Sequence, residues 1–179
     1  MYLSNGNLVI RNAELEDAEV LCRWWNDGVV MDHAGFPHGL GTTPERIRSD
    51  LATDSDAEQR RLILEIDSVL VGEMSYRRKS DTIAEIGIKI CDFKQHNKGY
   101  GTRFLMILVE SLFDEMGYEK ITLDTNLKNT GAQHVYESIG FQEVATHINS
   151  WKNQTGELQS SVDYELTKTA YLKKEYGSA

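Results

Sequence analysis

The sequence contains little cysteine and little proline, and each shortage excludes a class of protein. Only two cysteines occur in 179 residues, Cys22 and Cys91, and they lie far apart with no metal-binding spacing. This usage argues against a disulfide framework and predicts a reducing compartment and no metal site. Two prolines and 14 glycines are too few for a collagen-like or proline-rich disordered chain.

Positive charge and long apolar runs are also lacking. The formal net charge of −9 argues against a nucleic-acid partner, because neutralising phosphates needs a basic surface. The opening residues 1–12 lack the basic region, apolar stretch and cleavage site of a signal peptide. No uninterrupted apolar run is long enough to span a bilayer. We therefore expect a cytoplasmic protein with no membrane partner.

What the sequence does contain is one α/β domain, which we expect to span residues 1–179, with a core of about 7–168 and a short C-terminal tail. Apolar periodicity and turn residues predict the element order β-α-α-β-β-β-α-β-α-β-β around a mixed sheet. Segment 28–42 is glycine-rich and reads as a loop. Strands are expected at 7–11, 61–66, 69–78, 83–90, 120–126, 141–153 and 157–168, and helices at 15–27, 44–54, from the following turn to about 116, and at 129–140.

The turn Lys98-Gly99-Tyr100-Gly101-Thr102 stands directly before the long apolar-striped helix. Glycines before a helix can expose backbone N–H groups, which together with the positive end of the helix bind anions such as pyrophosphate. The glycines could also do no more than turn the chain. A dinucleotide fingerprint is excluded, because Phe104 stands where it needs a third glycine, and the lysine precedes the first glycine rather than closing a P-loop.

Two motifs resemble those of the GNAT N-acetyltransferase superfamily. Its motif A is written Q/R-x-x-G-x-G/A, and residues 96–101 match it except that His96 replaces the Gln or Arg. The second motif, N-x-x-A-x-x-x-Y-x-x-x-G-F, is matched within residues 129–141. The resemblance covers roughly residues 7–168 and implies the GNAT fold, in which the fourth and fifth strands, 83–90 and 120–126, splay apart. The opening residues 8–27 look similar to the RimJ/RimL-like branch, which acetylates N-termini of ribosomal proteins.

The resemblance implies acetyl-CoA as co-substrate and a primary amine as acceptor. Backbone groups on the strand 83–90 would hold the pantetheine arm, and the glycine turn would hold the pyrophosphate. Asn129 would reach the cofactor, although a helix N-cap alone explains its position. The implied cofactor-binding residues are Ile88, Lys89, Ile90, His96, Asn97, Lys98, Gly99, Tyr100, Gly101, Thr102 and Asn129.

The same resemblance suggests how protons move during the reaction. Tyr136 occupies the family's position for a general acid, although a packed aromatic residue would look the same in the sequence. The general base is either Asp124, which we rank slightly higher, or Glu85 on the other splayed strand. Either carboxylate could equally be solvated or paired with a cation.

Several kinds of amine acceptor are compatible with the sequence. Aromatic and charged residues of segment 24–42 and of the last hairpin suit a cationic amine, and the candidates are Trp24, Asp32, His33 and Trp151. A peptide N-terminus is our first expectation. An aminoglycoside 6′-amine and a polyamine such as spermidine are the alternative acceptors. A hypothesis of a different kind is that the protein is a non-catalytic acyl-CoA-binding module. The last strand and the tail could also contribute to a homodimer.

Overall fold

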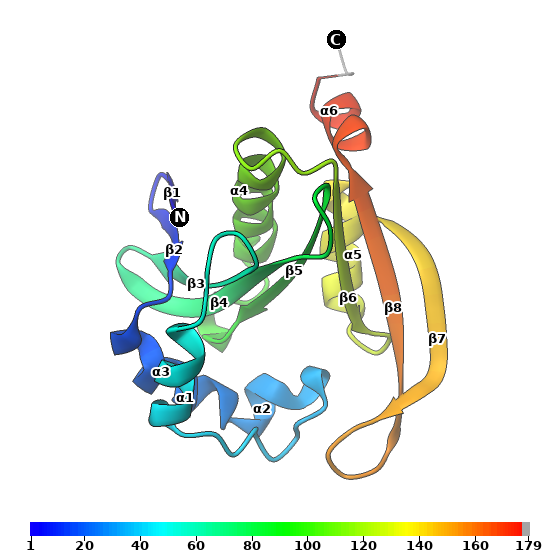
Figure 1. Ribbon diagram of the computed structural model, residues 1–179. Coiled ribbons are helices and arrows are strands. Elements are labelled where there is room, and N and C mark those ends of the chain that lie inside the picture. Colours follow the sequence, from blue (N-terminus) through cyan, green and yellow to red (C-terminus); the bar gives the residue numbers. More distant parts are fainter. Residues whose placement is uncertain (177–179) are drawn as a thin grey trace.

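In the computed structural model, which describes residues 1–176, eight strands form one open sheet in the order β1-β2-β3-β4-β5-β6-β8-β7 (Figure 1). The strands are Tyr2–Asn5 (β1), Leu8–Asn12 (β2), Gln59–Ile66 (β3), Val69–Arg78 (β4), Ile83–Ile90 (β5), Lys120–Asn126 (β6), Gln142–Lys152 (β7) and Leu158–Thr167 (β8). The helices are Ala18–Trp25 (α1), Gly28–Met31 (α2), Pro44–Leu51 (α3), Tyr100–Asp114 (α4), Thr130–Ile139 (α5) and Lys168–Tyr176 (α6), with 3-10 turns at Leu15–Asp17 (η1), Asp32–Ala34 (η2) and Phe93–Gln95 (η3).

The predicted separation of strands 83–90 and 120–126 is confirmed. β5 and β6 are parallel, and they pair only where Ile83–Glu85 faces Lys120–Thr122. Beyond this short ladder the two strands diverge, while β5 stays paired with β4 up to Ile90 and β6 stays paired with β8 up to Asn126. The sheet therefore contains an interior gap whose edges carry backbone groups without a neighbouring strand.

Alternation along the strands gives the sheet two different faces. One face packs against α4 and α5 in the main core, which contains Leu64, Met74, Ile86, Ile121, Val162, Phe104, Leu108 and Leu112 among its buried residues. A smaller cluster on the other face joins Ile63 of β3 to α1 and α3. From β5 to β8 that second face carries polar side chains, such as those of Glu85, Asp124 and Asp163. The two faces meet at the gap.

Several differences from the predicted elements concern short segments. β1 was not predicted, and it pairs with β2 across a turn in which Gly6 has a φ of +62°. Segment 28–42 was expected to be a loop throughout, but it contains α2 and η2. α3 ends at Leu51 rather than near residue 54. The C-terminal tail forms the helix α6 directly after β8, and the structure describes this helix up to residue 176.

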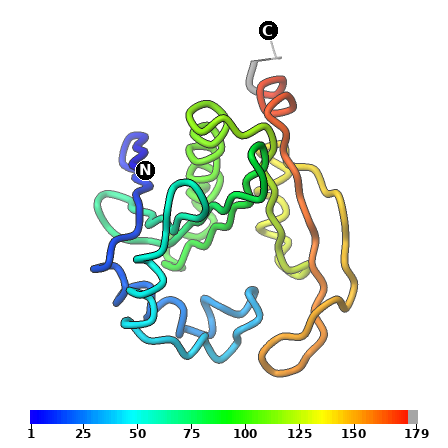
Figure 2. Tube along the Cα trace, in the orientation of Figure 1, coloured from blue at the N-terminus to red at the C-terminus, as the bar shows by residue number. Residues whose placement is uncertain are grey.

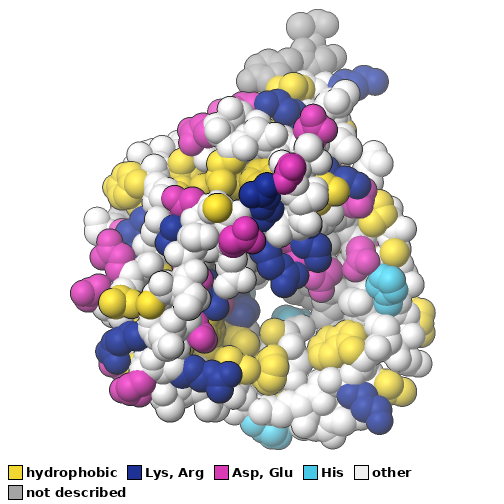
Figure 3. All heavy atoms as spheres, in the orientation of Figure 1, with side chains coloured by type: hydrophobic (Ala, Val, Ile, Leu, Met, Phe, Trp, Pro, Cys, Tyr) yellow, Lys and Arg dark blue, Asp and Glu magenta, His cyan; other side chains and the backbone are white. Residues whose placement is uncertain are grey.

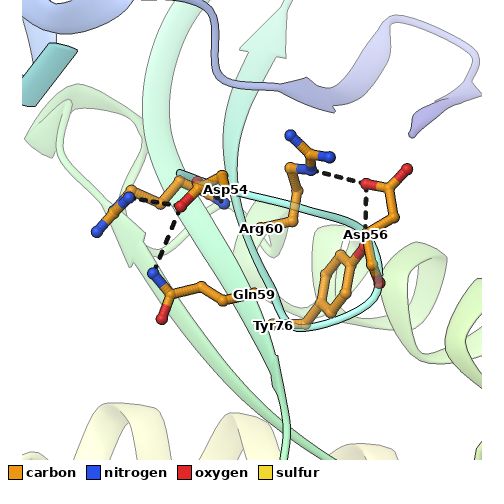
Figure 4. Close-up of polar contacts among 6 residues, drawn as sticks. Asp54, Asp56, Gln59, Arg60 and Tyr76 are labelled. Carbon is orange, nitrogen blue, oxygen red and sulfur yellow. Dashed lines mark hydrogen bonds and ion pairs between the residues drawn. The ribbon is translucent and has the colours of Figure 1, made fainter. Parts of the chain in front are cut away.

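Carboxylates hold the turn between α3 and β3 in place (Figure 4). The side chain of Asp54 is 3% exposed. It accepts two hydrogen bonds from Arg61, one from the side-chain Nη1 at 2.6 Å and one from the backbone N–H of Arg61 at 2.9 Å. Asp56 accepts from the Nε of Arg60 at 2.7 Å, and the hydroxyl of Tyr76 lies 3.3 Å from the same carboxylate oxygen. This network fixes Arg61, which reaches the cleft described next. Within residues 1–176 no helix has the length and apolar character needed to cross a membrane.

Candidate active site

A cleft of about 1340 Å³ follows the gap between β5 and β6. Its walls come from the α2–η2 segment, β4, β5, the η3–α4 turn, β6, α5 and β7. Figure 3 shows the molecule hollowed near the centre of the face it presents. Most of the candidate residues from the sequence line this cleft, since the segments that carry them all approach the gap.

The glycine turn reaches the cleft with its backbone amides free. Asn97 and Gly99 have φ values of +58° and +77°, and α4 starts at Tyr100 without a side-chain cap. Among the described residues, none accepts a hydrogen bond from the amides of 97–102, the first amide with a partner being that of Arg103. A Cβ at Gly99 or Gly101 would meet no protein atom within 4 Å. The turn therefore has both the donors and the space that a pyrophosphate group requires.

His96 has a different environment from the rest of the turn. Its Nε2 lies 2.8 Å from the carbonyl oxygen of Ile90, and its ring centroid is 4.8 Å from that of Phe93. This contact ties the turn to the end of β5. His96 therefore holds the turn against the end of β5 and also lines the cleft, as do the other residues of 96–102 except Lys98.

The three predicted backbone contacts on β5 point in two directions. The carbonyl of Ala84 accepts a hydrogen bond from the hydroxyl of Thr122 on β6 at 3.4 Å. The N–H of Cys91, directly after β5, instead donates to the carbonyl of Val71 on β4 at 2.8 Å. Because backbone groups alternate along a strand, Ile88 and Ile90 face the gap and Lys89 faces β4. A pantetheine arm could therefore pair with Ile88 and with the N–H of Ile90, but not with the backbone of Lys89.

Tyr136 lies at the gap, on α5. The residue is 6% exposed, and its ring packs against Phe141 and Tyr164 at centroid distances of 6.1 and 5.7 Å. No hydrogen bond joins its hydroxyl to another described residue. Burial, followed by the charge of Asp124, raises the pKa of Tyr136 to about 12. The hydroxyl is therefore protonated at neutral pH and can donate a proton into the cleft.

Asp124 faces the cleft from β6, directly opposite Asp163 of β8 in the register of the sheet. It makes no ion pair with a described residue. Asp124 is exposed to solvent in the cleft, but partial desolvation of its carboxylate by the surrounding walls, followed by repulsion from Asp163 and Glu85, raises its pKa. Raised basicity in an unpaired carboxylate beside Tyr136 is what a general base requires.

Glu85 lies apart from this arrangement. It forms ion pairs with Arg77 and with Lys79, the latter at 3.0 Å. Burial opposes ionisation, but these two cations outweigh it and lower the pKa of Glu85. The residue lines a second cavity of about 380 Å³, which shares Arg61, Ser75, Gly87 and Asp124 with the cleft. Asp124 thus stands where the two cavities meet, whereas Glu85 does not reach the cleft.

Asn129 lines the cleft and also caps α5, because its side chain accepts a hydrogen bond from the N–H of Ala132 at 3.3 Å. The predicted N-cap is therefore confirmed. Its side-chain N–H₂ group makes no hydrogen bond with the described residues and can still face a ligand.

On the acceptor side, Asp32, His33 and Trp151 all line the cleft, but Trp24 does not. Trp24 packs against the cluster formed by α1 and α3, and it is the next residue, Trp25, that reaches the cleft. Trp25 donates a hydrogen bond from Nε1 to Glu73 at 2.8 Å, and Glu73 also pairs with the Nζ of Lys89 at 3.3 Å. No signal in the sequence singles out Glu73, because it looks like a solvent-exposed strand residue until its partners Trp25 and Lys89 are known.

The comparisons with known proteins agree with this geometry. The family model of the acetyltransferase (GNAT) domain matches residues 7–142. An uncharacterized N-acetyltransferase, p20 of Bacillus licheniformis, is 23% identical over 171 residues, which cover 92% of this chain and 94% of that protein. A crystal structure of a probable acetyltransferase has a TM-score of 0.81 at 25% identity and covers 94% of this chain and 98% of its own.

A spermidine N-acetyltransferase from Vibrio cholerae, solved in complex with CoA and spermine, also has a TM-score of 0.81. It is 21% identical and covers 94% of this chain and 99% of its own, a likeness that shows the fold alone. The fold and the cleft define an acyl-transfer enzyme. The chain belongs to the GNAT acetyltransferase family, and it is an acetyl-CoA-dependent N-acetyltransferase. The matches do not distinguish the RimJ/RimL-like branch from others.

Proposed function

We propose that the protein acetylates the α-amine of a peptide or protein N-terminus, with Tyr136 as general acid and Asp124 as general base. The observation that supports this most directly is the presence of both residues in one cleft, with Asp124 close enough for its charge to raise the pKa of Tyr136. Bound acetyl-CoA supplies the acetyl thioester, and the free amides of 97–102 and the edge of β5 provide its binding groups.

The two residues act at opposite ends of the transfer. Asp124 takes a proton from the acceptor ammonium, through water or directly, so that the neutral amine can attack. Tyr136 holds its proton at neutral pH because its pKa is about 12, and it can give that proton to the departing sulfur. The second cavity beside Asp124 opens a route by which the abstracted proton can reach solvent.

The cleft offers fewer unpaired carboxylates than a polyamine such as spermidine has ammonium groups. Of the carboxylates that line it, Glu73 is already paired with Lys89. Asp124 and Asp32 form no ion pair with a described residue. A polyamine carries several ammonium groups and needs a matching number of free carboxylates, whereas a peptide N-terminus brings one positive charge to Asp124. Polar side chains beyond it, such as Ser75 and Ser161, suit the amides of a peptide.

Release of CoA thiol in the presence of three amines tests the acceptor. The panel is a Ser-starting hexapeptide, spermidine and kanamycin, each with acetyl-CoA and a no-amine blank. We expect the largest kcat/KM for the peptide. A higher value for spermidine or kanamycin would contradict the acceptor class while leaving the acetyltransferase activity intact. Tight CoA binding without turnover of any amine would instead favour a non-catalytic acyl-CoA-binding module.

A further inference from the structure

The turn between β7 and β8 is fastened to segment 26–42, which we call the acceptor loop. Gln154, in this turn, donates from its backbone N–H to the carbonyl of Gly35 at 2.8 Å. Its side chain accepts from the N–H of His38 at 3.0 Å and donates to the carbonyl of Gly39 at 2.9 Å. The ring of Trp151 lies against Gly35, where an added Cβ would be 2.4 Å from a ring carbon. We call these contacts the clasp.

The acceptor loop is itself tightly packed, so the clasp joins two defined structures. Asn26 closes the loop by donating to the carbonyl of Thr42 and accepting from its N–H, both at 2.9 Å. Inside the loop, a Cβ at Gly28 would lie 2.0 Å from the carbonyl oxygen of Pro37. The ends of the acceptor loop are therefore close together, and its interior is filled by its own atoms.

The clasp closes a ring around the acceptor end of the cleft. Asp32 and His33 line the cleft from the acceptor loop, and Trp151 lines it from β7. Figures 1 and 2 show the β7–β8 turn beside the loop that contains α2. Gln154 lies just outside the lining residues and bridges the two walls. An acceptor at this end must therefore enter through an enclosed opening rather than along an open groove.

We infer that Gln154 is a positioning residue for acceptor choice: by holding the clasp shut, it restricts the reaction to amines at the end of a slender, flexible chain. This inference rests on the proposed function and narrows it. We expect an extended peptide N-terminus to thread the ring more readily than a fused or branched body such as an aminoglycoside, or an amine on a folded surface. Gln154 acts through the position of Trp151 and the acceptor loop and touches no reacting atom.

The test compares acceptors of different width in matched variants. Gln154→Ala removes both side-chain bonds, whereas Gln154→Glu keeps the acceptor for His38 but loses the donor to Gly39. Lys152→Ala, on the same hairpin and without a contact to the acceptor loop among the described residues, is the control. For each protein, CoA release gives kcat/KM for the Ser-starting hexapeptide and for kanamycin, together with KM for acetyl-CoA.

We expect Gln154→Ala to raise the kanamycin-to-peptide ratio of kcat/KM by about tenfold, since two hydrogen bonds each shift an open–closed equilibrium by roughly threefold to tenfold. Gln154→Glu should give a smaller rise, and Lys152→Ala none, with KM for acetyl-CoA unchanged throughout. An equal ratio in the wild type and Gln154→Ala would overturn the role of the clasp and leave the proposed function intact. Failure of every protein to acetylate either amine would overturn both.

Discussion

Replacing Tyr136 by Phe removes one hydroxyl from the cleft and leaves the rest of the side chain in place. The ring keeps its contacts with Phe141 and Tyr164, and the hydroxyl has no hydrogen-bond partner among the described residues. The folded protein therefore loses little, and we expect the melting temperature to stay within about 2 °C. Loss of a general acid lowers turnover by roughly 10²-fold to 10⁴-fold. KM for acetyl-CoA should change little.

Tyr164 supplies a matched control because it belongs to the same aromatic cluster. Its hydroxyl donates to Glu137 at 3.1 Å, and it does not line the cleft. Tyr164→Phe should therefore show the opposite pattern. Breaking that hydrogen bond destabilises the fold by about 1–2 kcal/mol, which lowers the melting temperature by roughly 2–8 °C. Turnover should remain near the wild-type value.

CoA release at saturating acetyl-CoA and peptide gives kcat, and thermal unfolding followed by circular dichroism gives the melting temperature. We expect Tyr136→Phe to lower kcat but not the melting temperature, and Tyr164→Phe to lower the melting temperature but not kcat. If Tyr136→Phe kept kcat within about threefold of wild type, Tyr136 would not be the acid. If both variants lost turnover equally, the effect would belong to the packing of the aromatic cluster.

Three further predictions concern other parts of the chain. Asp124→Asn should lower kcat by roughly 10²-fold through loss of the base. Because the pKa of Asp124 is raised in the folded protein, its protonated form favours folding, and this stabilisation is lost as pH rises. The variant should therefore melt no lower than wild type at neutral pH, and a clearly lower melting temperature would contradict the pKa shift. Gly101→Val should raise KM for acetyl-CoA at least about tenfold without lowering the melting temperature, since its Cβ would enter space free of protein atoms within 4 Å, and an unchanged KM would mean that the pyrophosphate binds elsewhere. Asp17→Asn should reduce the free energy of unfolding at neutral pH by about 2–4 kcal/mol, as it leaves Arg11 half-paired. Burial opposes ionisation of Asp17 but Arg11 outweighs it and lowers its pKa, so this stability is lost as pH falls through the folded pKa; urea unfolding should show the difference shrinking in acid, and a constant difference would refute the assignment.

The parts of the fold that the sequence predicted are those with strong local signals. α5 begins at Asn129, whose side chain caps it, and ends before Gly140, which has a φ of +117°. Thr43 and Pro44 likewise start α3. Alternating apolar residues placed β3, β4 and β5 within a few residues of their ends. β1 and α2 were missed because each has only four residues, too few for a period to show.

Some residues of the candidate site could likewise be predicted from local sequence, and others could not. The glycine turn and the motif of residues 129–141 are each continuous in the chain, and most of the residues predicted in them line the cleft, with Lys98 as an exception. The choices that depended on partners could not be made from the sequence. Trp24 and Trp25 are adjacent and both pack against the cluster of α1 and α3, but only Trp25 also lines the cleft, a difference that the sequence does not show. Glu85 and Asp124 look alike in the sequence, but Arg77 and Lys79 pair with Glu85, whereas Asp124 has no ion pair among the described residues and faces Asp163.

By itself the sequence determined most of the element order, because local periodicity, caps and glycines need no distant partner, and two contiguous motifs indicated the family and the segment expected to bind the cofactor. The tertiary structure decided the opposite pKa shifts of Asp124 and Glu85, the direction of each backbone group on β5, and the contacts of Gln154 with the acceptor loop. Those properties come from groups far apart in the chain that meet only when the sheet forms, and electrostatic and hydrogen-bond energies depend on that spacing.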